Sequence, residues 1–146
     1  MEKDEIILGG FLWAPSRKYW KEILNIINTQ YKLTRVKKYK FASFEDLEKM
    51  IIKLYENDKS APLDKIKKVK IKSLREFEPV CINFYFKVPH FDKNKSLEVI
   101  GMKKRIRNEY RDRITNYKKD IILHISDNSK QTVFINDLIN YYIIKK

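Results

Sequence analysis

Strand-like and helix-like runs take turns along the whole chain, and this alternation restricts the fold more than any other feature. Residues 31–41 place apolar side chains at about every second position, as in a half-buried strand. Residues 20–27 place them at the spacing of one helix face. The order of elements obtained in this way is β-α-β-α-(α)-β-α-β-α, which favours an α+β domain with a small sheet.

Four segments are predicted to be strands, namely residues 5–13, 31–41, 79–88 and 121–125. The first contains Gly9 and Gly10, which could bend the strand or let another group come close. The second is irregular near Arg35, which suggests a bulge. The third is rich in β-branched and aromatic residues between Pro79 and Pro89. An antiparallel arrangement of these strands, with helices packed on one side, would give a ferredoxin-like (split βαβ) fold.

Helical spacing of apolar residues predicts two helices in the first half of the chain. The first follows a turn at Pro15 and buries one face of residues 20–27. The second begins after Ser43, an acceptable N-cap with Asp46 three residues later. Its buried face comprises Leu47, Met50, Ile51 and Leu54. Residues 61–78 are ambiguous between a helix and a strand, and we favour the helix.

Two further helices are predicted in the second half. Residues 97–118 form the longest helix, despite Gly101, because six large residues fall on one side at about 100° per residue. These are Val99, Met102, Ile106, Tyr110, Ile114 and Tyr117. Asp127, Asn128 or Ser129 can cap the last helix. Its inward side chains are predicted to be Phe134, Leu138, Tyr141 and Tyr142.

Length and composition fit one domain spanning residues 1–146, because 43% hydrophobic residues are enough for a core. No run approaches the roughly 18 apolar residues of a membrane span, and the N-terminus is too acidic for a secretory signal. We therefore expect a cytoplasmic protein without membrane association. The single cysteine, Cys81, lies in an apolar stretch and is expected to be a buried small hydrophobe.

The formal net charge of +13 is the strongest global signal. An excess of Lys and Arg attracts polyanions such as nucleic acid or nucleotide phosphates. A genome that uses lysine as its default surface residue would give the same composition. Part of the charge is concentrated in residues 65–75, and part follows one flank of the predicted long helix. That flank, the basic ridge, comprises Lys104, Arg107, Arg111 and Lys118. It is either a solvated helix face or a phosphate clamp.

His124 is one of only two histidines and ends an apolar run. Ser126 and Asp127 follow at the predicted start of the last helix, where backbone N–H groups bind anions. A neutral imidazole is a competent nucleophile toward phosphorus, although a lone histidine in this position is more often a core residue. His90 lies in a loop and has no such setting. His124 is therefore the candidate phosphate acceptor.

The common nucleotide and hydrolase motifs do not occur in this sequence. We find no glycine-rich P-loop, no GxGxxG after a strand, no GxSxG and no kinase HRD or DFG motif. The two histidines are far apart and no carboxylate cluster accompanies them, so we expect no protein-bound metal site.

The segment IILHISDN resembles the N-x-x-H-G-S-D-S motif of nucleoside diphosphate kinases, which have a similar length and a ferredoxin-like fold. His124, Ser126 and Asp127 match the H-x-S-D core, and His124 would be the phosphorylated histidine. IRNEY (106–110) resembles the family's I-R-G-D-F, whose arginine contacts phosphates, so Arg107 would take that role.

A third segment, FASFEDLEKMIIKLY (41–55), resembles the family's segment after its second strand. That segment ends in a tyrosine near the catalytic histidine, and Tyr55 would take its place. Other positions depart from the family. Trp13 and Ala14 precede Pro15 where the family has K-P-D, so its lysine has no counterpart. Ile125 replaces the glycine after the histidine, and the orienting glutamate would fall near Ile135.

The resemblance implies a nucleotide-binding phosphotransferase that uses ATP or another NTP, with Mg²⁺ carried by the nucleotide. The implied catalytic residues are His124, Ser126 and Arg107. The implied phosphate- or nucleotide-binding residues are Lys104, Arg107, Arg111, Tyr55 and Asp127. The family also suggests a homo-oligomer.

Two alternatives do not require catalysis. Residues 65–75 and 103–119, with nine tyrosines available for stacking, fit a basic module that binds nucleic acid or an acidic protein partner. The second alternative is a degenerate relative that keeps the fold and only assembles with partners.

Overall fold

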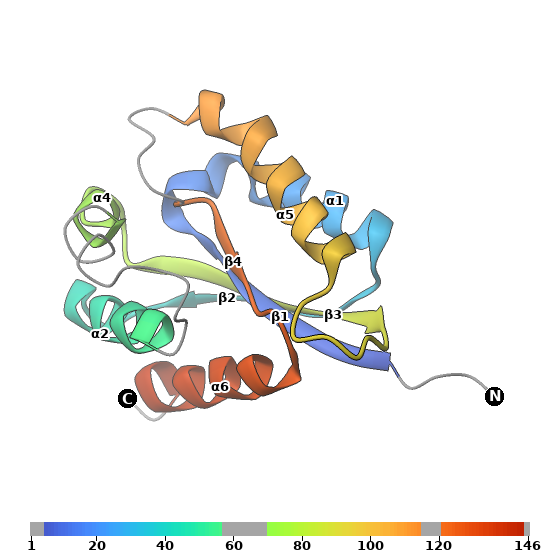
Figure 1. Cartoon of the computed structure of the whole chain (residues 1–146). Helices are drawn as coiled ribbons and strands as arrows, with labels where there is room; N and C mark the ends of the chain where they lie inside the picture. Colours follow the sequence, from blue (N-terminus) through green and yellow to red (C-terminus); the bar gives the residue numbers. More distant parts are fainter. Residues whose placement is uncertain (1–4, 57–69, 115–120, 145–146) are drawn as a thin grey trace.

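A four-stranded antiparallel sheet forms the centre of the computed structural model, which describes residues 5–56, 70–114 and 121–144 (Figure 1). The strands are β1 (Glu5–Trp13), β2 (Leu33–Lys40), β3 (Val80–Pro89) and β4 (Leu123–Ile125). They lie in the order β2-β3-β1-β4, and each neighbouring pair is antiparallel. β3 thus lies between β1 and β2, and β1 lies between β3 and β4. This split βαβ arrangement confirms the predicted ferredoxin-like fold.

The helical elements are η1 (Ala14–Tyr19), α1 (Trp20–Gln30), α2 (Phe44–Glu56), α4 (Lys72–Leu74), α5 (Leu97–Tyr110), η3 (Arg111–Arg113), α6 (Ser129–Ile139) and η4 (Asn140–Ile144). None of the described helices is long and apolar enough to cross a membrane.

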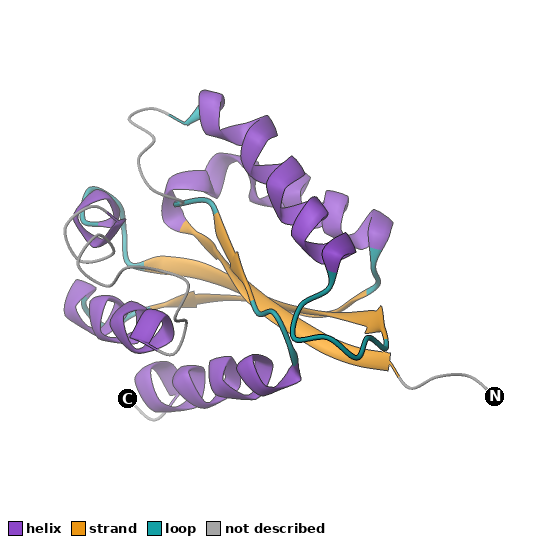
Figure 2. Cartoon of the chain, in the orientation of Figure 1, coloured by secondary structure: helices purple, strands orange, loops and turns teal. Residues whose placement is uncertain are grey.

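Helices cover both faces of the sheet, so the prediction that they pack on one side was wrong (Figure 2). Leu8 and Leu12 of β1 join a core with α1 and α5, which we call the α1/α5 face. Phe11 and Trp13 join a second core with α2 and α6, the α2/α6 face. Because successive side chains of a strand point to opposite faces, a strand that is apolar on both needs two covering layers.

The four predicted strands are confirmed to within about two residues at each end. The register shifts between Leu33 and Arg35, where a bulge was predicted. β4 begins at Leu123 instead of residue 121. Ile122 precedes it and still joins the sheet, since its carbonyl accepts a 2.9 Å hydrogen bond from the Trp13 N–H.

The helix predicted for residues 97–118 is shorter than expected, because α5 ends at Tyr110. The chain then tightens into η3, as the last turn of a helix commonly does. Ile114 follows in an extended conformation, with φ −99° and ψ 119°, and its side chain still reaches the core. Tyr117 and Lys118 lie outside the described residues.

The last helix is capped by Asn128, whose Oδ1 accepts a 3.0 Å hydrogen bond from the Gln131 N–H. Leu138 is buried as predicted, whereas Tyr141 is 63% exposed and corrects the prediction. α6 ends at Ile139 and continues as the π-helical η4, whose i→i+5 bonds change the angle between successive side chains. A spacing extrapolated from the α-helix therefore misplaces Tyr141.

Part of the ambiguous segment 61–78 lies outside the described residues, which resume at residue 70. In its described part, residues 70–74 are helical, in agreement with the predicted helix, and residues 75–78 are not; Leu74 is buried there. The second predicted helix is confirmed as α2, and the Ser43 Oγ accepts a hydrogen bond from the Asp46 N–H.

Candidate functional site

His124 lies in the middle of the edge strand β4, where its side chain faces the α2/α6 face. Its neighbours Leu123 and Ile125 point to the opposite core, beside α5. His124 pairs with Phe11 in the antiparallel register and is only 8% exposed. The sheet therefore holds the imidazole inside the protein, at the boundary of the core formed with α2 and α6.

Gly10 allows β1 and β4 to lie close together at this point. A Cβ added at Gly10 would collide with the backbone oxygen of His124. The glycine pair was predicted to let another group come close. At Gly10 that group is the backbone of His124, the candidate phosphate acceptor. Any larger residue at Gly10 would push β4, and with it His124, away from the sheet.

Tyr55, from the last turn of α2, contacts His124 edge to face, with ring centroids 5.3 Å apart and an interplanar angle of 75°. The Tyr55 hydroxyl accepts a 2.6 Å hydrogen bond from the Nζ of Lys70. The structure therefore brings the tyrosine named by the family resemblance to the histidine. It also adds a cation to the pair.

Lys70 is buried to 1% exposure, which is rare for lysine. Its Nζ lies 4.7 Å from the centroid of the Tyr55 ring and 5.5 Å from that of Trp13. Such positions over aromatic faces are favourable for a cation. Ala14, directly before Pro15, stands where the family has its K-P-D lysine. Because Trp13 is the neighbour of Ala14, Lys70 supplies a cation near that position from a different part of the chain.

Lys70 was not predicted as an individual site residue. It counted only as one of the basic residues of segment 65–75, because a lysine in a charged run is normally exposed. Two features of the sequence pointed to Lys70 only indirectly. The K-P-D motif has no lysine in this chain, and the basic segment 65–75 lies in a region of ambiguous secondary structure.

Ser126 has a structural role in the site. It is completely buried, and its Oγ accepts a 3.0 Å hydrogen bond from the Gly9 N–H and lies 2.8 Å from the Thr132 Oγ1. The Ser126 N–H in turn donates to the Gly9 carbonyl. These bonds tie the end of β4 to β1 and to α6.

Asp127 forms an ion pair with Lys103 of α5, with 3.3 Å between Oδ1 and Nζ. The same Nζ lies 3.4 Å from the carbonyl oxygen of Ile125. Lys103 thus joins α5 to the turn between β4 and α6.

The four residues of the predicted basic ridge do not all belong to one described helix. Lys104 and Arg107 belong to α5, Arg111 starts η3, and Lys118 lies outside the described residues. α5 covers the α1/α5 face, whereas the His124 ring faces Tyr55 on the other side of the sheet. Arg107 is one helical turn after Lys103, on the same flank. The residue of this flank that reaches the end of β4 is Lys103, through the Ile125 carbonyl and Asp127.

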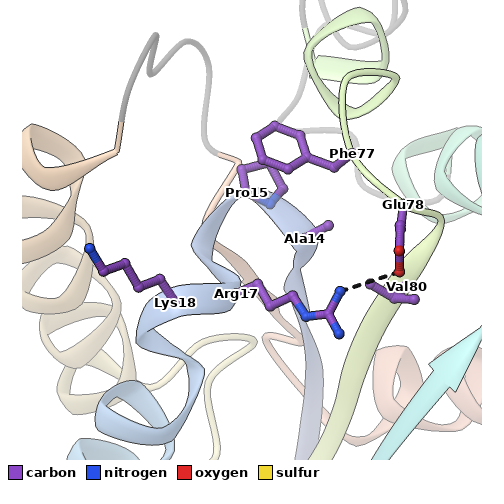
Figure 3. Close-up of a pocket in the computed structure, with 7 residues that line it drawn as sticks. All are labelled: Ala14, Pro15, Arg17, Lys18, Phe77, Glu78 and Val80. Carbon is purple, nitrogen blue, oxygen red and sulfur yellow. Dashed lines mark hydrogen bonds and ion pairs between the residues drawn. The ribbon is translucent and has the colours of Figure 1, made fainter.

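A hollow of about 410 Å³ opens where β1 ends (Figure 3). Ala14, Pro15, Phe77 and Val80 give it apolar walls. Arg17 reaches across it to Glu78, with a 3.3 Å ion pair. The hollow begins one residue after Trp13 and has the size of a small-molecule pocket. It could accommodate an apolar ring next to a charged group.

Within residues 5–56, 70–114 and 121–144, no three His, Cys, Asp or Glu side chains gather in a way that could hold a metal ion.

No protein-family model matches the sequence. No curated protein matches it at a significant level. Solved structures do match. The nucleoside diphosphate kinase of Aquifex aeolicus has a TM-score of 0.53 at 14% identity, over 93% of this chain and 95% of that chain. The NDP kinase of Pyrobaculum aerophilum has a TM-score of 0.52 at 13% identity, over 92% and 95%.

The nucleoside-diphosphate kinase of Borrelia burgdorferi, solved with bound vanadate and ADP as a transition-state mimic, has a TM-score of 0.50 at 11% identity, over 92% and 86% of the chains. The similarity covers nearly the whole of this chain. At these identities it establishes a common fold.

Proposed function

We propose that this chain is a nucleotide-binding phosphotransferase in which His124 accepts a phosphoryl group. One observation carries the proposal: His124 is held edge-on by Tyr55, whose hydroxyl accepts a hydrogen bond from the buried Lys70. A nucleophile with a cation nearby, in a site of low water content, is the arrangement that phosphoryl transfer requires. The fold shared with nucleoside diphosphate kinases supports this reading of the contacts.

In the proposed reaction an imidazole nitrogen of His124 attacks the γ-phosphorus of a nucleoside triphosphate. The bond between that phosphorus and the bridging oxygen breaks, and the nucleoside diphosphate leaves with the electron pair. The ammonium group of Lys70, beside the Tyr55 hydroxyl, offsets the negative charge of the transferring phosphoryl group. Mg²⁺ enters bound to the phosphates of the nucleotide. A second nucleoside diphosphate then takes the phosphoryl group from His124, as the names of the similar structures suggest.

Arg107, with Lys104 and Arg111, is proposed to bind phosphates at the outer edge of β4. The contact of Lys103 with the Ile125 carbonyl supports this, because it shows that this flank of α5 extends to the end of the strand. Arginine binds phosphate oxygens through two parallel N–H groups, which suits it to this position. Ser126 and Asp127 are proposed to contribute by fixing the turn that follows His124.

The test is incubation with γ-labelled ATP and Mg²⁺. A phosphohistidine is expected, so the label should be lost in acid and kept in base. His124→Asn should abolish labelling. The other histidine provides the matched control, because His90 is exposed and paired with Asp92 in a loop. His90→Asn should be labelled like the unchanged protein. Absence of label, or a label that persists in His124→Asn, contradicts the proposal.

A further inference from the structure

The edge strand β2 carries exposed cations on both of its faces. Its basic edge comprises Arg35, Lys37, Lys38 and Lys40, all exposed. The register pairs Arg35 with Tyr85 and Lys37 with Asn83, on the α2/α6 face of the sheet. Lys38 and Lys40 pair with Ile82 and Val80 and point to the α1/α5 face. The strand therefore presents two parallel rows of positive charge.

Acidic side chains do not offset this charge locally. Residues 31–43 contain no Asp or Glu. The ion pairs found among the described residues involve other cations, and Lys37 instead lies 5.2 Å from the centroid of the Tyr39 ring. The potential over the basic edge is consequently positive and attracts an anionic partner.

The backbone of β2 is also open on one side. In the described sheet β2 pairs with β3 alone and lies at the end of the strand order. Unpaired N–H and C=O groups of an edge strand are a template for another extended chain. A second copy of β2 does not suit this template, because pairing two such strands sets lysine and arginine against one another.

We propose that β2 binds an acidic polypeptide segment in extended conformation, which adds to the sheet as a fifth strand. Side chains of an added strand alternate between its two faces, so carboxylates along it meet both rows of the basic edge. A nucleic acid strand lying on one face would meet only one row. Val36, 43% exposed between the cations, accepts an apolar side chain of the partner. This surface is independent of the proposed phosphotransfer at His124.

The test uses the full-length chain and a fluorescent polyglutamate peptide about ten residues long, the length of a long strand. A second, longer peptide carries the same number of glutamates, each followed by proline, so it has the same charge but lacks every second backbone donor and pairs poorly as a strand. Fluorescence anisotropy should show binding of the first peptide that weakens with salt. Binding of the proline peptide should be at least about tenfold weaker, because only its charges can engage.

The variant Lys37→Glu with Lys38→Glu reverses one charge in each row and should weaken peptide binding at least about tenfold. Lys21→Glu with Lys130→Glu is the matched control, since it changes the net charge equally at exposed positions on other elements. Its affinity should stay within about twofold.

Four results would overturn the proposal. The first is no binding of the peptide, in which case the lysines only protect the edge from aggregation. The second is equal binding of the proline peptide. The third is tighter binding of a single-stranded oligonucleotide of equal charge. The fourth is a dimer in solution that the substitution Val36→Lys dissociates.

Discussion

Ser126 shows how a residue of the candidate motif can act through structure. Its buried Oγ accepts the Gly9 N–H and contacts Thr132, so it fixes the end of β4 against β1 and α6. The imidazole two residues earlier is thereby held at a defined place in the sheet. The catalytic role implied for Ser126 stays a prediction, and its described contacts are with Gly9 and Thr132 inside the fold.

Ser126→Ala removes the acceptor of a buried backbone N–H. We expect the free energy of unfolding to fall by about 1–3 kcal/mol, the usual effect of leaving such a group unsatisfied. Urea denaturation measures this. Ser129→Ala, at an exposed position in the first turn of α6, should change it by less than about 0.5 kcal/mol. Equal effects of the two substitutions would show that the Ser126 bonds do not stabilise the fold.

Lys70 is the residue on which the proposed chemistry depends most after His124. Lys70→Met keeps the length of the side chain and removes the cation, so the fold should be retained. The rate of labelling by γ-labelled ATP should fall about 10²–10³-fold, the typical effect of removing one group that stabilises transferring charge. Labelling at the original rate would mean that Lys70 only fills space between Trp13 and Tyr55.

The pairing of β1 with β4 depends on the absence of a side chain at Gly10. Gly10→Ala places a Cβ against the His124 carbonyl oxygen, which belongs to the backbone and cannot rotate away. We expect a loss of about 3 kcal/mol or more in the free energy of unfolding.

Gly101 provides the contrast, because an added Cβ there meets no atom within 4 Å. It is an exposed residue inside α5, so Gly101→Ala should raise the free energy of unfolding by about 0.5–1 kcal/mol through helix propensity. Thermal or urea denaturation of both variants gives the comparison. Similar losses for both would contradict the described packing of β1 on β4.

Strands and caps could be predicted from the sequence because they depend on neighbouring residues. The bulge near Arg35 and the caps at Ser43 and Asn128 are of this kind. The end of α5 and the exposure of Tyr141 could not be predicted, because a change to 3₁₀ or π geometry leaves no local signal in the apolar spacing. Lys70 was missed for another reason, since its burial depends on Trp13 and Tyr55, which are distant in sequence.

The two cores that enclose the sheet make the stability of the whole molecule sensitive to alkaline pH. Burial raises the pKa of the Cys81 thiol far above its ordinary range. Burial also raises the pKa values of Tyr31, Tyr85 and Tyr110. Since these pKa values are higher in the folded state, the unfolded chain loses its protons first. The contribution of these groups to the free energy of unfolding is fully present below their pKa values in the unfolded chain, and it decreases as the pH rises above those values.

For Cys81 the decrease begins near pH ~8.5 and amounts to about 1.4 kcal/mol per pH unit. The free energy of unfolding, measured by urea between about pH 8 and 10, should therefore fall less steeply in Cys81→Ala than in the unchanged chain. The substitution also leaves a cavity, which shifts the whole curve without changing its slope. Identical slopes would contradict the burial of a neutral thiol beside β1 and β2.

The proposed transfer of a phosphoryl group through His124 is supported by the fold shared with nucleoside diphosphate kinases and by the cluster of His124, Tyr55 and Lys70. The direct measurement is to label the chain with γ-labelled ATP, remove the nucleotide, and add unlabelled GDP. The proposed function predicts that the label leaves the protein and appears in GTP, and that His124→Asn yields neither labelled protein nor labelled GTP. Label that stays on the protein, or is released only as inorganic phosphate, would contradict it.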